Sequence, residues 1–306
     1  MVSDKLPQSV QHGPSAPLWR GLLLAGAGSI AFSGKAIIVK LAYRHGVDAV
    51  TLIMFRMLFA LPLFVLLAWW AGRGKPALTR HDALVVGGLG FSGYYLSSFL
   101  DFSGLQFISA SLERLILYLN PTIVLALGAL LFGQRVSAQR LAALAGSYAG
   151  ELLVFAHELR FAGPQTATGA ALVFASAVSY AIYLSYSGQE VRRLGALRLT
   201  GWATSVACLF CIAQFVLLRP LRAALVAPEV LWLSLLNATL CTVAPVLMVM
   251  MAIERIGATL TAQTGMIGPL ATIIMGVLIL GEPFNGWIVS GTALVLVGIW
   301  LLARAR

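Results

Sequence analysis

The sequence predicts an all-α integral membrane protein in which ten transmembrane helices form two inverted five-helix repeats. The composition is the first reason: of 306 residues, 59% are hydrophobic and only 10% are charged, whereas about a quarter of a soluble domain is charged. The mean hydropathy is +0.90. The net charge of +10 is spread between apolar stretches, which favours membrane topology over nucleic-acid binding as its cause.

Apolar stretches of spanning length are the second reason. A spanning helix needs about 20 mainly apolar residues, and ten stretches meet this requirement. They are residues 18–42, 49–71, 82–101, 106–132, 137–156, 166–188, 197–218, 229–252, 258–281 and 285–303. The continuous apolar pattern of the first stretch indicates an uncleaved span and not a signal peptide.

Lys and Arg give the orientation, because they concentrate in cytoplasmic segments. With the N-terminus inside, thirteen of these residues lie in cytoplasmic segments and four on the other side. We therefore expect both termini in the cytoplasm. Residues 1–17 would form a cytoplasmic tail, 157–165 an external linker, and 304–306 the cytoplasmic C-terminus.

An internal repeat is the third reason. A shift of 148 residues aligns "ISASLERLILYLNPTIVLALGALLFGQ" with "IGATLTAQTGMIGPLATIIMGVLILGE", so that Pro121 meets Pro269 and Gly133 meets Gly281. The halves, 18–156 and 166–303, then hold five spans each. An odd number makes the second half enter from the opposite side, as in many secondary transporters. The two prolines are predicted structural hinges.

Catalytic and metal-binding patterns are missing from the sequence. It contains no G-x-x-x-x-G-K-[ST] and no H-E-x-x-H, so neither an internal ATPase nor a zinc site has support. The cysteines lie in apolar runs, which favours buried packing over a disulfide; they are Cys208, Cys211 and Cys241. We expect no enzyme activity, no cofactor and no metal.

Charged residues inside the spans are the main functional signal. Lys35, Arg56, Glu113, Arg114 and Glu151 all fall at a similar depth in the external half of their spans. Each costs about 2.5–3.5 kcal/mol to insert, so it normally faces a partner or a wet cavity. The group is either a structural ion-pair network or the floor of a substrate cavity. Glu113 and Arg114 project about 100° apart on a helix and cannot face the same partner.

Polar residues near these charges extend the candidate substrate site. Tyr118 and Asn120 follow Arg114 and Glu113 at helical spacing, and Tyr180 and Tyr183 lie on a polar face of the span 166–188. Asp101 falls at the predicted end of its span, where water can reach it. If protons are coupled to transport, Glu113 and Glu151 are the candidates, because a carboxyl group in a low-dielectric site can retain its proton.

The order of the motifs resembles one family. The run from "AFSGKAIIVKLAY" through "FRMLFALPL" to "LGEPFNGWIVSGTALVLVGIWLL" is similar to the drug/metabolite transporter superfamily, EamA type. The resemblance implies a multi-pass permease of the cytoplasmic membrane with a central cavity and alternating access. It matches Lys40 and Arg56 to basic positions of the family. The family's acid after the fourth-helix glycine is present as Glu282 and replaced by Gln134 in the first half.

The sequence thus favours a secondary transporter that exports a small polar or zwitterionic metabolite such as an amino acid. Two alternatives stay open: a multidrug exporter of lipophilic cations, and a non-transporting or lipid-handling membrane subunit. The expected partners are the substrate, protons as the candidate coupling ion, and the lipid bilayer, but not nucleic acid. The chain would act as a monomer or a homodimer.

Overall fold

The described part of the chain is helical throughout. A computed structural model describes residues 18–117, 119–132, 149, 165–265, 267–283 and 286–304, and all regular elements in these ranges are helices. Within these ranges, seven helical segments are long and apolar enough to cross a membrane. The chain is therefore a multi-pass membrane protein. The predicted span 137–156 lies outside the described residues, so the count of ten stays a prediction.

The first half begins with two long apolar helices, α1 (Leu18–Tyr43) and α2 (Ala49–Gly72). Asp48 starts α2, because its carboxylate accepts hydrogen bonds from the backbone N–H groups of Val50 and Thr51. The next segment is continuous from Arg80 to Leu105 and comprises α3 (Arg80–Gly90), the π-helical turn η1 (Phe91–Leu96) and α4 (Ser97–Leu105). It is followed by α5 (Ala110–Leu117) and α6 (Asn120–Phe132).

The second half repeats this pattern. It contains α8 (Gln165–Leu194), α9 (Ala196–Leu218), the short 3₁₀ turn η2 (Leu221–Ala224), α10 (Pro228–Ala238) and the π-helical turn η3 (Thr239–Val243). Then follow α11 (Ala244–Gly265), α12 (Ile267–Met275), the π-helical turn η4 (Gly276–Leu280) and α13 (Gly286–Arg304).

Element bounds recur 148 positions apart. The bounds of α3 and α10 correspond residue for residue, and η1 and η3 begin at corresponding residues. π-Helical turns are rare and often mark functional sites. Their occurrence at the same place in both halves is a structural counterpart of the aligned prolines and glycines.

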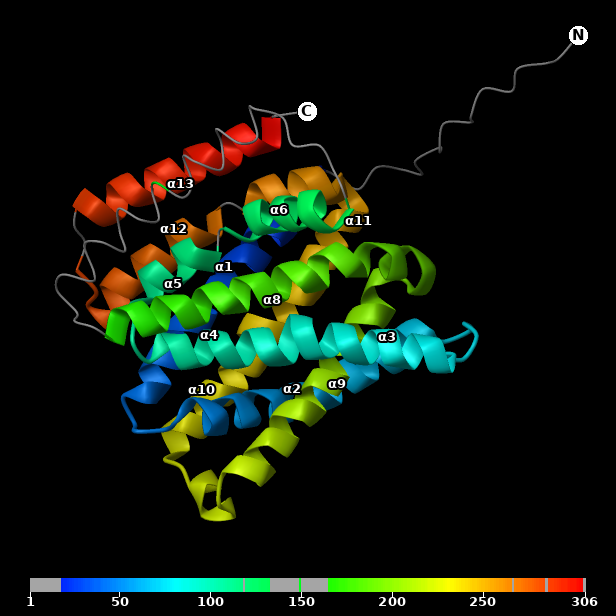
Figure 1. Ribbon diagram of the computed structural model, residues 1–306, viewed down its shortest axis with the longest axis horizontal. Coiled ribbons are helices and arrows are strands. Elements are labelled where there is room, and N and C mark those ends of the chain that lie inside the picture. Colours follow the sequence, from blue (N-terminus) through cyan, green and yellow to red (C-terminus); the bar gives the residue numbers. More distant parts are fainter. Residues whose placement is uncertain are drawn as a thin grey trace, which may run out of the picture.

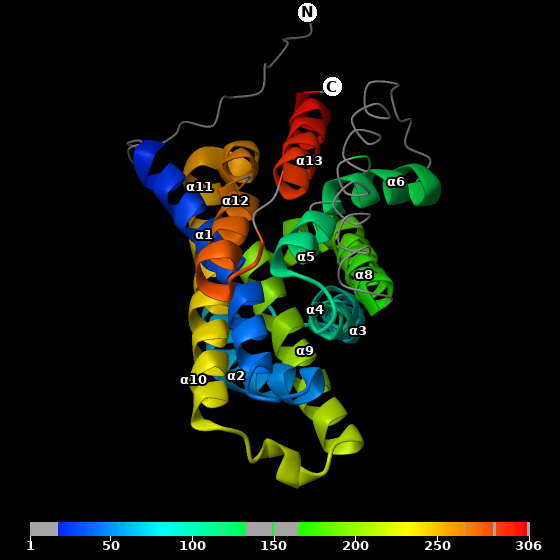
Figure 2. The same cartoon turned by 90° about the vertical axis from the view of Figure 1, so that its left-hand side faces the viewer.

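The predicted single span 106–132 is two helices. The helix stops at Leu117 and a new one begins at Asn120, and the chain changes course between α5 and α6 (Figure 2). Pro121 therefore sits in the first turn of α6, where the missing N–H of a proline costs no hydrogen bond. Pro269, its counterpart, lies near the start of α12 (Ile267–Met275).

The predicted boundary between the spans 229–252 and 258–281 is also wrong. We expected a loop over residues 253–257, whereas α11 continues through it from Ala244 to Gly265. Arg255 is exposed there and donates to the carbonyl of Met251 one turn earlier. The segment holds no proline, so a charged residue alone does not interrupt the helix.

Contacts between helices join the two halves. α1 packs against α11 and α12, α2 against α9, and α4 against α8. Figure 1 shows the segment α3–α4 running beside α8, and Figure 2 shows α1 beside α10, α11 and α12. Glycine permits the closest approaches: a Cβ atom on Gly90 would lie 2.4 Å from the backbone oxygen of Ala203 in α9. The space enclosed between these helices holds the charged residues.

Ion pairs link the helix ends. At one end of the molecule, Arg193 of α8 pairs with Asp82 at the start of α3. At the junction before α2, Arg219 donates to Asp48 over 3.2 Å. Each pair joins two segments that the charge bias of the sequence assigns to the same side of the membrane.

Candidate functional site

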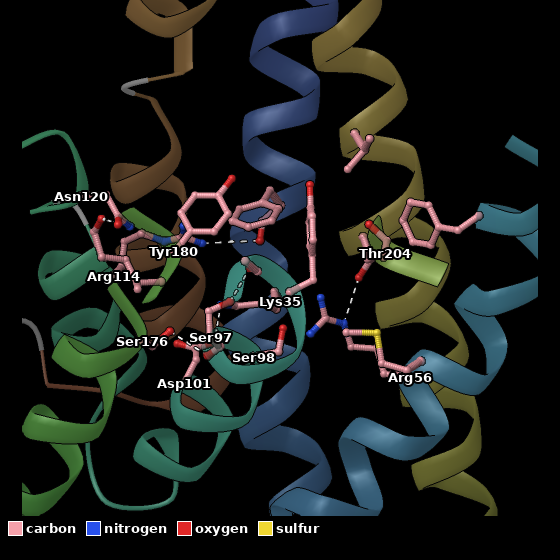
Figure 3. Close-up of a pocket in the computed structure, with 18 residues that line it drawn as sticks. Lys35, Arg56, Ser97, Ser98, Asp101, Arg114, Asn120, Ser176, Tyr180 and Thr204 are labelled. Carbon is pink, nitrogen blue, oxygen red and sulfur yellow. Dashed lines mark hydrogen bonds and ion pairs between the residues drawn. The ribbon is translucent and has the colours of Figure 1, made fainter. Parts of the chain in front are cut away.

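A cavity of about 260 Å³ lies between the two halves. Its volume is near the lower end of the range for small-molecule pockets, about 300–1,000 Å³. Helices α1, α2, α4, α5, α6, α8, α9 and α11 and the turns η1 and η3 contribute to its wall (Figure 3). The polar and charged residues that line it are Lys35, Arg56, Tyr94, Ser97, Ser98, Asp101, Arg114, Asn120, Ser176, Tyr180, Thr204 and Thr242.

Lys35 is the centre of a buried ion cluster. Its Nζ atom lies 2.5 Å from Oδ2 of Asp101 and 2.9 Å from Oε1 of Glu113. The three residues come from α1, α4 and α5, and they are 5%, 3% and 0% exposed. Burial of this kind removes hydration, so the charges must satisfy one another. Figure 3 shows Lys35 and Asp101 meeting at the cavity wall.

Arg56 approaches the cavity from α2. Its Nε atom donates to Oγ1 of Thr242 over 3.0 Å, and its guanidinium carbon lies 5.1 Å from the ring centroid of Phe102. Thr242 is in the π-helical turn η3 and donates to the carbonyl of Asn237, five residues earlier. The Nη1 atom of Arg56 is buried and makes no hydrogen bond to any described residue.

Arg114 approaches from α5. Its Nε atom donates to Oγ1 of Thr272 over 3.0 Å, and Nη2 to the carbonyl of Phe32 over 3.4 Å. The guanidinium carbon lies 5.5 Å from the ring centroid of Phe32. The hydrogen-bond partners described for both arginines are therefore neutral, and the charges of Asp101 and Glu113 act on Arg56 and Arg114, respectively, without a described hydrogen bond. In Figure 3 Arg114 and Arg56 enter from different sides of the drawn site.

Aromatic and small polar groups complete the wall. The ring of Tyr180 lines the cavity and stacks on Tyr183 with centroids 5.5 Å apart. The hydroxyl groups of Tyr183 and Tyr94 lie 3.1 Å apart. Asn120 donates from Nδ2 to the carbonyl of Leu117, and its buried Oδ1 atom has no hydrogen-bond donor among the described residues.

The structure brings together most of the residues that the sequence singled out. Five of them line the cavity, and Glu113 lies behind the wall against Lys35. The five are Lys35, Arg56, Arg114, Asn120 and Tyr180. Tyr183 contacts Tyr180 but is not among the lining residues. Tyr118 and Glu151 lie outside the described residues. Different faces of α5 present Glu113 and Arg114 to different partners, as their spacing predicts.

Asp101 is the residue whose role the sequence reasoning misjudged. We expected it at a span end and in contact with water, but α4 continues to Leu105 and the carboxylate is buried against Lys35. A charged residue four positions from a helix end can face inwards when its side chain lies on the packed face. Tyr94, Ser97 or Ser98, and Asp101 share helical spacing in the sequence, and that stripe was the available signal.

Comparison with known proteins shows the family to which the chain belongs. The pattern that defines the EamA-like transporter family matches two stretches of the chain, residues 19–156 and 167–304. The chain belongs to the EamA-like transporter family. A protein of Bacillus subtilis (strain 168) named "Uncharacterized transporter YcbK" is 30% identical over 271 residues, which cover 86% of each protein. A solved structure described as "Crystal structure of protein" has a TM-score of 0.62 over 93% of this chain and 97% of its own, at 19% identity. That likeness concerns the fold alone.

In this EamA-like transporter the second-half "LGE" sequence has a visible structural role. Gly281 adopts φ 71°, a conformation that glycine tolerates best, and ends η4 so that Glu282 turns back. The Glu282 carboxylate accepts hydrogen bonds from the backbone N–H of Ala110 over 2.7 Å and from the N–H and hydroxyl of Ser111 over 3.2 and 2.7 Å. Glu282 thus caps α5, the helix that carries Glu113 and Arg114. Gln134, its counterpart in the first half, lies outside the described residues.

Proposed function

We propose that the protein is a secondary transporter that moves a small polar or zwitterionic metabolite, such as an amino acid, through this cavity. The observation that carries the proposal is the pair of guanidinium groups, Arg56 and Arg114, whose described hydrogen-bond partners are all neutral. A buried cation normally has an anionic partner. A substrate carboxylate would supply that partner, while Asn120 and Tyr180 would contact the rest of the molecule.

The arrangement of the halves supports alternating access. The cavity lies between helices from both halves, as expected for a transporter built from ten helices in two inverted five-helix repeats, 18–156 and 166–303. Pro121 and Pro269 would be the hinges, the first beside the helix interruption at Leu119. Because α5 carries Arg114, a movement at this interruption would change the site directly.

Orientation and direction follow from the sequence and the family. The Lys and Arg bias favours cytoplasmic termini, and the resemblance favours the cytoplasmic membrane and outward transport. The pairs Arg193–Asp82 and Arg219–Asp48 are consistent with this topology. Glu113 is the candidate for proton coupling that lies at the site.

A binding screen tests the substrate class. Purified protein is mixed with amino acids, organic acids and lipophilic cations, and ligand-induced thermal shifts are measured; each hit is then tested for flux in proteoliposomes. We expect hits that carry a carboxylate. Flux of a cationic dye alone would favour multidrug export, and flux of none of these compounds would favour a non-transporting subunit.

Arg114→Ala tests the site itself. Truncating one partner of a buried charge pair costs about 2–5 kcal/mol, so we expect affinity for a carboxylate hit to fall at least about 30-fold. Membrane insertion should be intact. Arg222→Ala is the matched control, because Arg222 is exposed in η2 and far from the cavity lining. Unchanged affinity and flux in Arg114→Ala would disprove the role of this cavity.

A further inference from the structure

Two buried carboxyl groups share one ammonium group. The single positive charge of Lys35 lies 2.5 Å from Asp101 and 2.9 Å from Glu113. Oδ1 of Asp101 and Oε2 of Glu113 are buried and accept no hydrogen bond from any described residue. With both acids ionised the cluster would carry a net negative charge and unsatisfied oxygens, an expensive arrangement away from water.

The two carboxyl groups are also close to each other. Both lie against the same Nζ atom of Lys35, at 2.5 Å for Asp101 and 2.9 Å for Glu113. Ionised carboxylates are acceptors only, whereas a protonated carboxyl group has one O–H donor. A hydrogen bond between the two groups therefore requires one proton. Like charges at such a distance also resist ionisation of both groups.

Other charged or titratable groups that approach the cluster or the cavity beside it come from six elements. They are Tyr43 of α1, Arg56 of α2, Tyr94 of η1, Arg114 of α5, Tyr180 of α8 and Cys241 of η3. The two arginines line the cavity, and their described hydrogen bonds go to neutral partners. None of these six residues donates a described hydrogen bond to Oδ1 of Asp101 or Oε2 of Glu113.

From this geometry we infer that Asp101 and Glu113 form a proton-binding site that holds a single proton between them, with Lys35 as their common counter-ion. The site deepens the proposed function, because Lys35 and Asp101 also line the cavity. An anionic substrate that attracts the Lys35 ammonium would leave the acids with less counter-charge and strengthen their hold on the proton. Anion and proton would then bind together.

Infrared difference spectroscopy tests this site without any substrate. The C=O stretch of a protonated carboxyl group is distinct from the bands of a carboxylate. At about pH 7 exposed carboxyl groups, with pKa values near 4, are ionised. The full-length protein in liposomes should show one protonated carboxyl group that both Asp101→Asn and Glu113→Gln remove, because each variant leaves one acid paired with one ammonium.

Two further variants sharpen the test. Lys35→Met removes the counter-ion, so the signal should grow to about two protonated groups. Glu229→Gln is the control, since Glu229 is exposed at the start of α10, and it should leave the signal unchanged. Absence of the signal in the wild type, or its survival in either acid variant, would overturn the inference. Neither result would bear on whether the cavity binds a carboxylate.

Discussion

The contact between Glu282 and α5 permits a quantitative prediction. In Glu282→Ala the N–H groups of Ala110 and Ser111 lose their acceptor, as does the Ser111 hydroxyl. These N–H groups lie at the first turn of α5, which has only eight residues. A helix this short has little stability of its own, so loss of these hydrogen bonds should destabilise α5 along its whole length.

The magnitude follows from the type of bond. Replacing an N-terminal capping side chain by alanine costs about 0.5–2 kcal/mol, and hydrogen bonds to charged groups contribute about 1.5–3 kcal/mol. Glu282 is partly exposed, so water replaces some of what is lost. We therefore expect about 1–3 kcal/mol of local destabilisation. Since about 1.4 kcal/mol is a factor of ten, the opening equilibrium of this turn should increase roughly 5- to 150-fold.

Hydrogen exchange measured by mass spectrometry reads this turn directly. Peptides that contain residues 110–114 should exchange faster in Glu282→Ala by that factor. Glu282→Gln keeps a carbonyl oxygen as acceptor and loses the charge, so its effect should be smaller. Glu229→Gln serves as the control for loss of an exposed charge. Exchange at residues 110–114 that is unchanged in Glu282→Ala would refute the capping role.

Two further predictions concern packing and pH. Gly104→Ala should lower the free energy of unfolding, measured by thermal unfolding, by about 1–3 kcal/mol. The reason is that the added Cβ would lie 2.7 Å from a backbone oxygen of α8. Gly87→Ala is the control: it has open space around it and should be neutral or stabilising in the same assay. Burial acts to raise the pKa of Asp48, but hydrogen bonds from Thr51 and the charge of Arg219 outweigh it and lower the pKa. A carboxyl group whose pKa is lowered by folding stabilises the fold at pH values above its unfolded pKa, which is near 4. This stabilisation is lost as the pH falls. Asp48→Asn keeps the helix cap but removes the charge, so it should reduce stability at pH 7. The loss should be less than about 1 kcal/mol, because the pair with Arg219 is partly exposed. In acid the variant should be as stable as the wild type. A difference that persists in acid would contradict this reasoning.

Much of the fold could be predicted because it depends on local properties of the chain. Apolar runs of spanning length predicted the membrane class, and Pro121 predicted the interruption between α5 and α6. The π-helical turns could not be predicted in this way. Their extra residue depends on contacts such as that of Thr242 with Arg56, which come from another helix. The continuity of α11 past Arg255 was missed for a related reason, since a charge marks contact with water and does not by itself end a helix.

The sequence predicted which residues belong to the candidate site, but not which of them pair with one another. Insertion cost identified Lys35, Arg56, Glu113 and Arg114 as residues that need a partner. Helical spacing also predicted that Glu113 and Arg114 face different partners. The expectation for Asp101 failed because its position near the end of a predicted span suggested contact with water.

The sequence by itself determined that this chain crosses a membrane many times, that its halves resemble each other, and that a few charges must be sheltered inside. Only the tertiary structure decided that Lys35 pairs with both Asp101 and Glu113, and that the described hydrogen-bond partners of Arg56 and Arg114 are neutral. The physical reason is that helical periodicity shows which residues share a face, whereas packing between helices far apart in the chain decides what that face meets.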